Sequence, residues 1–172
     1  RNGRCCRFDE NDARALGRTA SGVRGINIED DDEVVGMITY DPTAEDASAH
    51  SILVVSENGY GKRSDFDEYR KTNRGGKGVK TLNITDKTGV LVAMKNVTDE
   101  NDLMIINRSG LTIRMAVSDI RVAGRNTQGV RLINIKEGDS IAAISAVNKS
   151  EDETVAPVED ATQTPPSENV ND

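Results

Sequence analysis

Short runs of apolar residues, separated by turn residues, dominate the hydrophobic pattern of this chain. Two four-residue runs occupy residues 52–55 and 103–106, and Asn58-Gly59, a strong two-residue hairpin signal, follows the first of them. Other apolar residues alternate with polar ones at the period of a half-buried strand, at Ile26 and Ile28, Leu82 and Ile84, and Ile133 and Ile135. A further apolar run follows at residues 34–38, 90–97 and 141–147. No segment sustains a helical period, so the pattern predicts an all-β fold.

These runs recur in three copies of one sequence unit. When the copies are aligned on the turn glycines Gly3, Gly59 and Gly110, a second glycine followed by valine comes nineteen residues later each time, at Gly22, Gly78 and Gly129. The turn glycines are 56 and 51 residues apart, a period typical of four-stranded propeller-like blades. We therefore expect a partial propeller-like domain over residues 1–147, with blades of about 1–47, 48–100 and 101–147. The first blade is expected to be truncated, and the chain to be a piece of a longer protein, because no strand precedes Gly3.

Basic residues occupy four positions of this unit in every copy. Counted from the turn glycine, they are the fourth position (Arg7, Arg63, Arg114), the eleventh (Arg14, Arg70, Arg121), the fifteenth (Arg18, Arg74, Arg125) and the twenty-first (Arg24, Lys80, Arg131). Three of the four positions are always arginine, whose planar guanidinium can donate two hydrogen bonds to one phosphate. The pattern thus predicts a regular track of phosphate-binding cations. Alternatively, the arginines form surface ion pairs with the recurring acids Asp12, Glu68 and Asp119, pairs that contribute little energy.

The arginines of the fifteenth position are the strongest candidates. They lie in turns of small and polar residues that each end in glycine, at residues 17–22, 73–78 and 124–129, and Lys77 adds a cation to the second turn. Such a turn lets backbone N–H groups approach a phosphate while the arginine supplies charge. The same glycines would also serve a tight connection that needs positive φ, and the two interpretations are compatible.

The net charge of -7 is unevenly distributed. Residues 148–172 hold seven acidic residues and one lysine, a balance of -6, so the other 147 residues have 21 basic and 22 acidic side chains, a balance of -1. This tail also carries three of the four prolines and no aromatic residue, and we expect it to be disordered. Residues 1–147 are therefore nearly neutral, and more than half of their positive charge lies in the four repeated positions.

Four segments closely resemble the last blades of the C-terminal domain in the A subunit of bacterial DNA gyrase: LGRTASGVRGI at residues 16–26, ENGYGKR at 57–63, EYRKTNRGGKGVKTL at 68–82 and VAGRNTQGVRLI at 122–133. The resemblance runs from residue 1 to about 147. The C-terminal domain of the topoisomerase IV A subunit is the nearest related alternative. The resemblance implies a β-pinwheel, a propeller-like disc whose basic rim wraps double-stranded DNA with positive handedness and so supports ATP-dependent negative supercoiling.

The resemblance also implies partners and cofactors outside this segment. The gyrase B subunit and a second A subunit would complete an A2B2 heterotetramer, which uses ATP and Mg²⁺ elsewhere. The family's signature box, Gln-Arg-Arg-Gly-Gly-Lys-Gly, is matched only in its Arg-Gly-Gly-Lys-Gly part at residues 74–78, in a later blade than the box occupies. We expect Arg74 and Lys77 to contact phosphate, and the box itself to lie upstream.

No catalytic residue or metal site is predicted. Tyr40, Tyr60 and Tyr69 have no neighbouring histidine or acidic metal cluster of the kind that a tyrosine nucleophile in a topoisomerase needs, so we expect them to be packing residues. His50 stands alone in an acidic loop. The adjacent Cys5 and Cys6 indicate a reducing, cytoplasmic setting, and no apolar run suggests a membrane span.

Two functions remain open at this point. The first is a duplex DNA-wrapping module without chemistry of its own, in which the acidic tail competes with DNA for the basic rim. The 3% aromatic content favours contact with the duplex backbone over base stacking. The second is a propeller-like protein-interaction module whose arginines are only surface charge.

Overall fold

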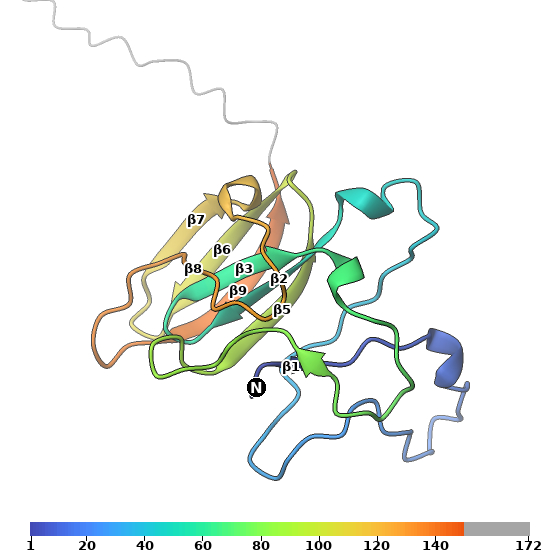
Figure 1. The fold of residues 1–172 in the computed structure, drawn as a ribbon. Coiled ribbons are helices and arrows are strands. Elements are labelled where there is room, and N and C mark those ends of the chain that lie inside the picture. The colour runs from blue at the N-terminus through green and yellow to red at the C-terminus, as the bar shows by residue number, and fades with distance from the viewer. Residues whose placement is uncertain (150–172) are drawn as a thin grey trace, which may run out of the picture.

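The computed structural model describes residues 1–149, so the predicted disordered tail, apart from its first two residues, lies outside the described part of the chain. Within it the fold is built from antiparallel strands and single 3₁₀ turns, which confirms the all-β prediction (Figure 1). The strands are β1 (Arg4–Cys5), β2 (Ser51–Ser56), β3 (Tyr60–Ser64), β4 (Val79–Lys80), β5 (Leu91–Val97), β6 (Asn101–Asn107), β7 (Thr112–Ala116), β8 (Val130–Arg131) and β9 (Ile141–Asn148). The 3₁₀ turns are η1 (Glu10–Asp12), η2 (Ala47–Ala49), η3 (Phe66–Glu68) and η4 (Val117–Asp119). None of the described helices has the length and apolar character needed to cross a membrane.

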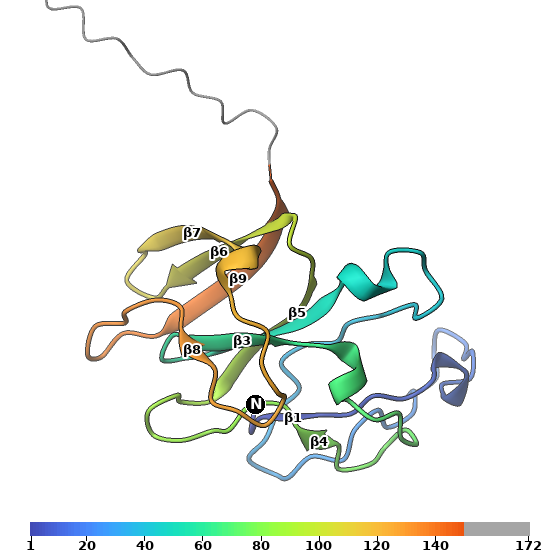
Figure 2. The same ribbon diagram turned by 45° about the horizontal axis from the view of Figure 1, so that its top comes forward.

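The strands form three antiparallel sheets. The largest has the order β5-β2-β3-β8, the next β7-β6-β9, and the smallest is the pair β1-β4 (Figure 2). In the second and third repeats (residues 48–100 and 101–147), the strand before the turn glycine is central, with the strand after the turn on one side and the late apolar run on the other. The two repeats therefore build the same sheet from the same parts of their sequence.

Strand pairing differs from the prediction that each repeat supplies all four strands of its own blade. Strand β8 of the third repeat pairs with β3 of the second, with Tyr60 opposite Arg131. Strand β4 of the second repeat likewise pairs with β1 of the first, with Arg4 opposite Lys80. The chain between the turn glycine and the second glycine thus crosses to the neighbouring sheet, and the second and third repeats each donate one short strand to the repeat before them.

The first repeat (residues 1–47) contains fewer strands than its sequence predicts. Residues 34–38 form no strand, and Val34 and Met37 are 63% and 82% exposed. In the later repeats the equivalent run pairs with the strand that precedes the turn glycine, as β5 does with β2. Among residues 1–149, no strand precedes Gly3 and none pairs with residues 34–38.

The alternating apolar residues after the second glycine also fall mostly outside strands. Strands β4 and β8 contain two residues each and end before Leu82 and Ile133. Both of these side chains are nevertheless buried, at 1% and 8% exposure. The alternation therefore marks burial correctly, although it overestimates the length of the strand.

The core consists of two apolar clusters. One contains Leu53, Leu103 and Ile105 among its members, and the other contains Ile52, Tyr69 and Leu82. Residues 52 and 53 of β2 thus contribute to different clusters, because successive side chains of a strand point to opposite faces of the sheet. The first cluster combines buried side chains of the second and third repeats, and partly buried side chains of the first repeat pack against the second cluster, so burial of apolar surface holds neighbouring repeats together.

The three tyrosines pack as predicted. Tyr69 is fully buried and Tyr60 is 6% exposed. The Tyr40 ring stacks on Phe66 with 3.7 Å between the ring centroids. The Tyr69 hydroxyl lies 2.5 Å from the hydroxyl of Thr81, within hydrogen-bonding distance.

Each contact between neighbouring repeats of the described chain includes two closely packed glycines, one from each repeat. A Cβ added to Gly59 would lie 2.5 Å from the carbonyl oxygen of Ile133, and one added to Gly129 would lie even closer to that of Gly61. Both glycines also have positive φ, of 83° and 76°. The constant nineteen-residue spacing therefore has a physical basis, because both ends of the spacer must fit against a neighbouring backbone.

Candidate nucleic-acid interface

Two of the three arginines of the fourth position, Arg63 and Arg7, lie between repeats. Arg63 is 7% exposed, and it donates from Nε to the Ile120 carbonyl at 2.8 Å and from Nη1 to Asp99 at 2.5 Å. Arg7 donates from Nη1 to the carbonyls of Phe66 and Tyr69, at 2.7 and 3.1 Å. Both guanidinium groups thus fix the 3₁₀ turn of the following repeat, and the structure does not present Arg63 as a surface cation.

The third arginine of this position, Arg114, donates from Nε to Asp102 at 2.7 Å. The predicted ion-pair alternative fails in its choice of acids, because none of Asp12, Glu68 and Asp119 forms an ion pair within residues 1–149. The acids that pair with the fourth-position arginines are Asp67, Asp99 and Asp102.

Two arginines of the fifteenth position also bond to the preceding repeat. Arg74 donates from Nη1 to the Arg24 carbonyl at 2.5 Å, and Arg125 donates from Nη1 to the Lys80 carbonyl at 2.9 Å. Both are only partly exposed. Arg18 is exposed, and its side chain makes no hydrogen bond or ion pair with the described residues. Of the three arginines that the sequence favours most as phosphate contacts, two therefore bond to the preceding repeat, and only Arg18 is exposed without a side-chain partner in the described residues.

Backbone groups of the glycine-ended turns are partly used in the same contacts. Gly75 N–H donates to the Gly25 carbonyl at 2.8 Å, and the Gly76 carbonyl accepts from Asn27 N–H at 2.9 Å. In the next repeat the Thr127 carbonyl accepts from Asn83 N–H at 3.1 Å. The final glycine of each turn, at positions 22, 78 and 129, has positive φ. The interpretation as a tight connection is thus confirmed, and at least one backbone donor is already occupied by protein.

The eleventh position supplies the clearest free cations. Arg14, Arg70 and Arg121 are exposed, and their side chains form no hydrogen bond, ion pair or cation–π contact anywhere in residues 1–149. Lys77 is exposed and equally without a side-chain contact in that range. An exposed guanidinium without an intramolecular acceptor can donate two parallel hydrogen bonds to one phosphate.

The cations of the twenty-first position share one local arrangement. Each is exposed and donates to the side-chain oxygen of an asparagine three residues later: Arg24 to Asn27, Lys80 to Asn83 and Arg131 to Asn134, at 3.1 to 3.3 Å. Sequence reasoning missed these asparagines, although the signal was present, because asparagine occupies the twenty-fourth position in every copy. The amide holds each cation at the surface without neutralising its charge.

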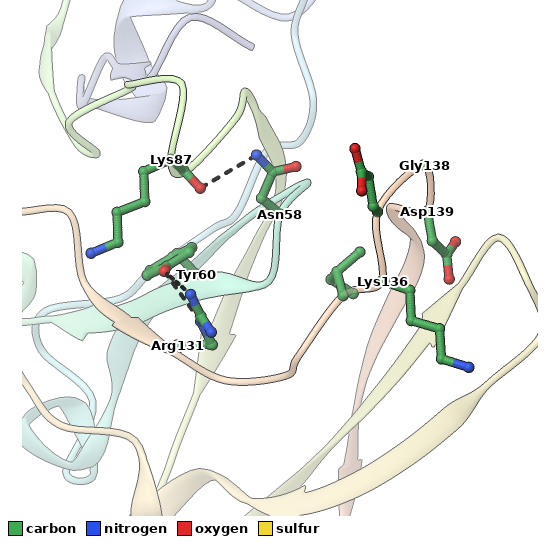
Figure 3. A pocket seen from close by; sticks show the side chains of 9 residues that line it. Asn58, Tyr60, Lys87, Arg131, Lys136, Gly138 and Asp139 are labelled. Carbon is green, nitrogen blue, oxygen red and sulfur yellow. Dashed lines mark hydrogen bonds between the residues drawn. The ribbon is translucent and has the colours of Figure 1, made fainter.

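Arg131 also lies in a shallow polar depression between the second and third repeats. Its Nη2 and Nε donate to the Tyr60 hydroxyl at 2.7 and 3.1 Å, and its guanidinium lies 5.3 Å from the ring centroid (Figure 3). The Lys87 ammonium lies 5.3 Å from the same ring centroid. The depression measures about 310 Å³ and is also bordered by Lys136. Tyr60 therefore places two cations together at the joint between repeats.

Lys62 is a buried cation that sequence reasoning did not single out. It is 1% exposed, and its ammonium donates to the Gly124 carbonyl at 2.5 Å. Burial lowers the pKa of the Lys62 ammonium to about 8. This lysine therefore helps to hold the third repeat against the second, and it is not accessible to a ligand.

The arrangement offers exposed positive charge. Within residues 1–149, no group of three histidine, cysteine or acidic side chains could hold a metal ion. Of the cations that the sequence predicts as phosphate contacts, the exposed ones are those of the eleventh and twenty-first positions, together with Arg18, Lys77 and Arg114. Such a surface can bind a polyanion.

Comparison with known proteins identifies the family. The sequence model of the DNA gyrase C-terminal domain, beta-propeller, matches residues 1–41, 50–98 and 101–148. The chain belongs to this family. The A subunit of DNA gyrase from Staphylococcus epidermidis is 47% identical over 146 residues, and that from Staphylococcus aureus strain NCTC 8325 is 47% identical over 149 residues. These matches cover 85% and 86% of this chain but only 16% of each relative, so the chain spans about a sixth of their length.

Two solved structures are similar in fold. The DNA gyrase A C-terminal domain aligns with a TM-score of 0.74 at 23% identity, over 84% of this chain and 47% of that one. The C-terminal domain of DNA topoisomerase IV aligns with a TM-score of 0.75 at 23% identity, over 86% of this chain and 44% of that one. The fold predicted from the resemblance is thereby confirmed.

Proposed function

We propose that this chain binds and wraps double-stranded DNA as part of the C-terminal domain of a DNA gyrase A subunit, and that it thereby supports ATP-dependent negative supercoiling. The single observation that carries the proposal is the set of Arg14, Arg70 and Arg121. These exposed guanidinium groups recur once per repeat and have no acceptor within the described protein.

The packing of the repeats turns this sequence period into a spatial one. The two contacts between neighbouring repeats use the same strand pairing, with residues 4 and 60 opposite residues 80 and 131. We therefore infer that equivalent cations recur at equivalent places in successive repeats, as the phosphates of a duplex recur along its axis. A track of this kind favours contact with the DNA backbone irrespective of base sequence.

The remaining features of the holoenzyme are expectations from family membership. We infer that the gyrase B subunit and a second A subunit assemble with the parent protein as A2B2, and that ATP and Mg²⁺ act in other parts of that assembly. We place the protein in the cytoplasm, where the unbridged thiols of Cys5 and Cys6 would stay reduced.

The curated relatives favour gyrase over topoisomerase IV as the parent, because two gyrase A subunits are 47% identical to this chain. The similarity to the topoisomerase IV domain is a similarity of fold at 23% identity. A propeller-like module that binds protein and not DNA is the other outcome that the experiment below distinguishes.

The decisive experiment measures binding and wrapping together. The chain is titrated into a fluorescent duplex at 50 to 300 mM salt, and separately into closed circular DNA that a type I topoisomerase relaxes in its presence. We expect affinity to fall with salt, with a log–log slope at least as steep as about -2.7 for three phosphate contacts, and the topoisomers to shift toward positive linking difference. Absence of binding at 50 mM salt would refute the proposal in favour of a protein-interaction module. Binding without a topoisomer shift would refute wrapping.

A further inference from the structure

The depression between the second and third repeats contains hydrogen-bond donors that the protein uses only in part. Arg131 carries five N–H groups, all of them donors. Three bonds leave this guanidinium within residues 1–149, two of them to the Tyr60 hydroxyl and one to the Asn134 side chain. The remaining N–H groups of Arg131 can therefore donate to a ligand.

The Tyr60 hydroxyl borders the same depression with its proton unused. Both bonds to this oxygen come from Arg131, whose guanidinium can only donate, so the hydroxyl oxygen acts as acceptor in both. The hydroxyl proton has no acceptor among residues 1–149, although Tyr60 is only 6% exposed. A ligand that meets this hydroxyl must therefore accept a hydrogen bond.

Lys87 adds a second cation at the same place. Its ammonium lies 5.3 Å from the Tyr60 ring centroid, and the guanidinium carbon of Arg131 lies at the same distance from that point (Figure 3). Lys87 is exposed, and its ammonium has no hydrogen bond or ion pair with the described residues. Because a lysine side chain is flexible, the ammonium and the guanidinium can converge on one anion.

Two acids also border the depression, and they do not cancel this charge. The Asp139 carboxylate accepts from the side chains of Asn107 and Ser109 at 2.6 and 2.8 Å, and Figure 3 shows it directed away from Tyr60. Glu137 is exposed and forms no ion pair in the part of the chain that the structure describes. The groups next to the Tyr60 ring are therefore positively charged.

We propose that this depression binds a terminal phosphoryl group, that of inorganic phosphate or of a small phosphate monoester. Tyr60 and Lys87 of the second repeat and Arg131 of the third each donate to one of its oxygens. The volume of about 310 Å³ is at the lower end of the range of small-molecule sites. The proposal does not depend on DNA binding.

The donors match a terminal phosphoryl group better than a phosphate within a nucleic-acid backbone. A terminal group has three acceptor oxygens and a charge close to -2 at neutral pH, which suits three donor side chains of which two are cations. A backbone phosphodiester has two unesterified oxygens and a single negative charge, so it would leave one donor without an acceptor. A planar carboxylate likewise has two oxygens.

The site is particular to the second contact between repeats. At the first contact, Arg4 stands at the position of Tyr60 and lies opposite Lys80, the equivalent of Arg131. Asp31 stands at the position of Lys87. An acid thus replaces one of the two cations, and the hydroxyl donor is replaced as well. The sequence period could not have indicated this site, because its members do not recur.

Two probes test the proposal by ¹H–¹⁵N NMR titration of the 172-residue chain at pH 8 and low salt. Methyl phosphate is a dianionic monoester at this pH, and dimethyl phosphate is a diester with one charge. We expect methyl phosphate to shift the amide signals of Tyr60, Lys87 and Arg131 saturably, and dimethyl phosphate to bind at least about tenfold more weakly, because it lacks one acceptor oxygen and one charge.

Single substitutions locate the site. Lys87→Gln should weaken methyl phosphate binding about tenfold, because it removes one charge-assisted hydrogen bond. Glu137→Gln should strengthen binding about threefold, because it removes a negative charge from the border. Lys95→Gln is the matched control: it loses the same charge as Lys87→Gln, but Lys95 does not line the depression, so affinity should stay unchanged.

Three results would overturn the proposal. The first is the absence of saturable shifts at Tyr60, Lys87 and Arg131 up to 50 mM methyl phosphate. The second is equal affinity for the two probes, which would make the depression a contact for backbone phosphodiesters. The third is an equal effect of Lys87→Gln and Lys95→Gln, which would mean that methyl phosphate responds only to the overall charge of the chain. Because neither probe contains DNA, these results are independent of whether the chain wraps a duplex.

Discussion

Replacing the three arginines of the eleventh position is the sharpest test of the DNA-binding surface. The variant Arg14→Gln, Arg70→Gln, Arg121→Gln removes three exposed charges whose side chains contact nothing in residues 1–149. Because no intramolecular bond is lost, we expect each substitution to change the free energy of unfolding by no more than about 0.5 kcal/mol. A loss of DNA affinity can therefore be assigned to the interface itself.

The size of the effect follows from counterion release. Each phosphate contact contributes about 0.9 to the slope of log K against log salt, so losing three contacts should make the slope shallower by about 2.7. If this contribution vanishes near 1 M salt, the three contacts account for a factor of about 500 in affinity at 0.1 M salt. The equivalent triple at the fifteenth position would give a less clear answer, because Arg74 and Arg125 also bond to the preceding repeat.

Fluorescence anisotropy with one duplex, at five or more salt concentrations, measures both quantities. The control variant Arg1→Gln, Lys95→Gln, Lys149→Gln loses the same charge at sites outside the four repeated positions, and its slope should stay close to that of the unmodified chain. If the arginine variant keeps the original slope, or if both variants lose equal affinity, the eleventh position does not contact phosphate.

Four further outcomes are expected. Arg63→Met should lower the free energy of unfolding by about 2 kcal/mol in urea titrations, because it leaves a buried carbonyl without its donor; an unchanged midpoint would contradict a role between repeats. Gly129→Ala should cost about 3 kcal/mol in the same assay, but Gly110→Ala only about 1, since both have positive φ and only the first meets a neighbouring backbone; equal costs would refute the close-packing argument. The pKa of Lys62 falls to about 8 on folding from an ordinary value of 10.5, so the unfolded chain binds more protons between these values. The stability of the unmodified chain relative to Lys62→Met should therefore rise as the pH increases from 8 to 10.5, and a flat difference would argue against burial of the ammonium. Removing residues 150–172 should tighten DNA binding at low salt if the acidic tail competes with DNA, and unchanged affinity would dismiss competition.

Much of the fold could be predicted because its signals are local. Apolar runs bounded by turn residues predicted β2, β6 and the hairpin at Asn58-Gly59, and glycine spacing predicted the repeat. The membership of each sheet could not be predicted in this way. Periodicity predicts an extended segment after Gly129 that buries Ile133, but the pairing of β8 with β3 of the preceding repeat depends on the path of the chain between them.

The sequence predicted which repeat positions carry the cations of the candidate site, but it did not predict what each cation does. The sequence places arginine at the fourth, eleventh and fifteenth positions without distinguishing them. Burial separates Arg63, which bonds to the neighbouring repeat, from Arg70, which is exposed and without a contact in the described chain. The emphasis on the fifteenth position was only partly justified, because a glycine-ended turn serves packing between repeats as well as phosphate binding.

By itself, the sequence determined that this chain is a repetitive all-β protein with periodic cations and a separate acidic tail, since hydrophobic period, turn residues and charge are properties of the chain. Only the tertiary structure decided which cations are available to a ligand. A guanidinium donates to whichever acceptor lies within about 3 Å, and the carbonyls that engage Arg63, Arg74 and Arg125 come from other repeats, 45 to 57 residues away along the chain. The packing of the repeats brings these donors and acceptors within hydrogen-bonding distance, and no local sequence pattern contains that information.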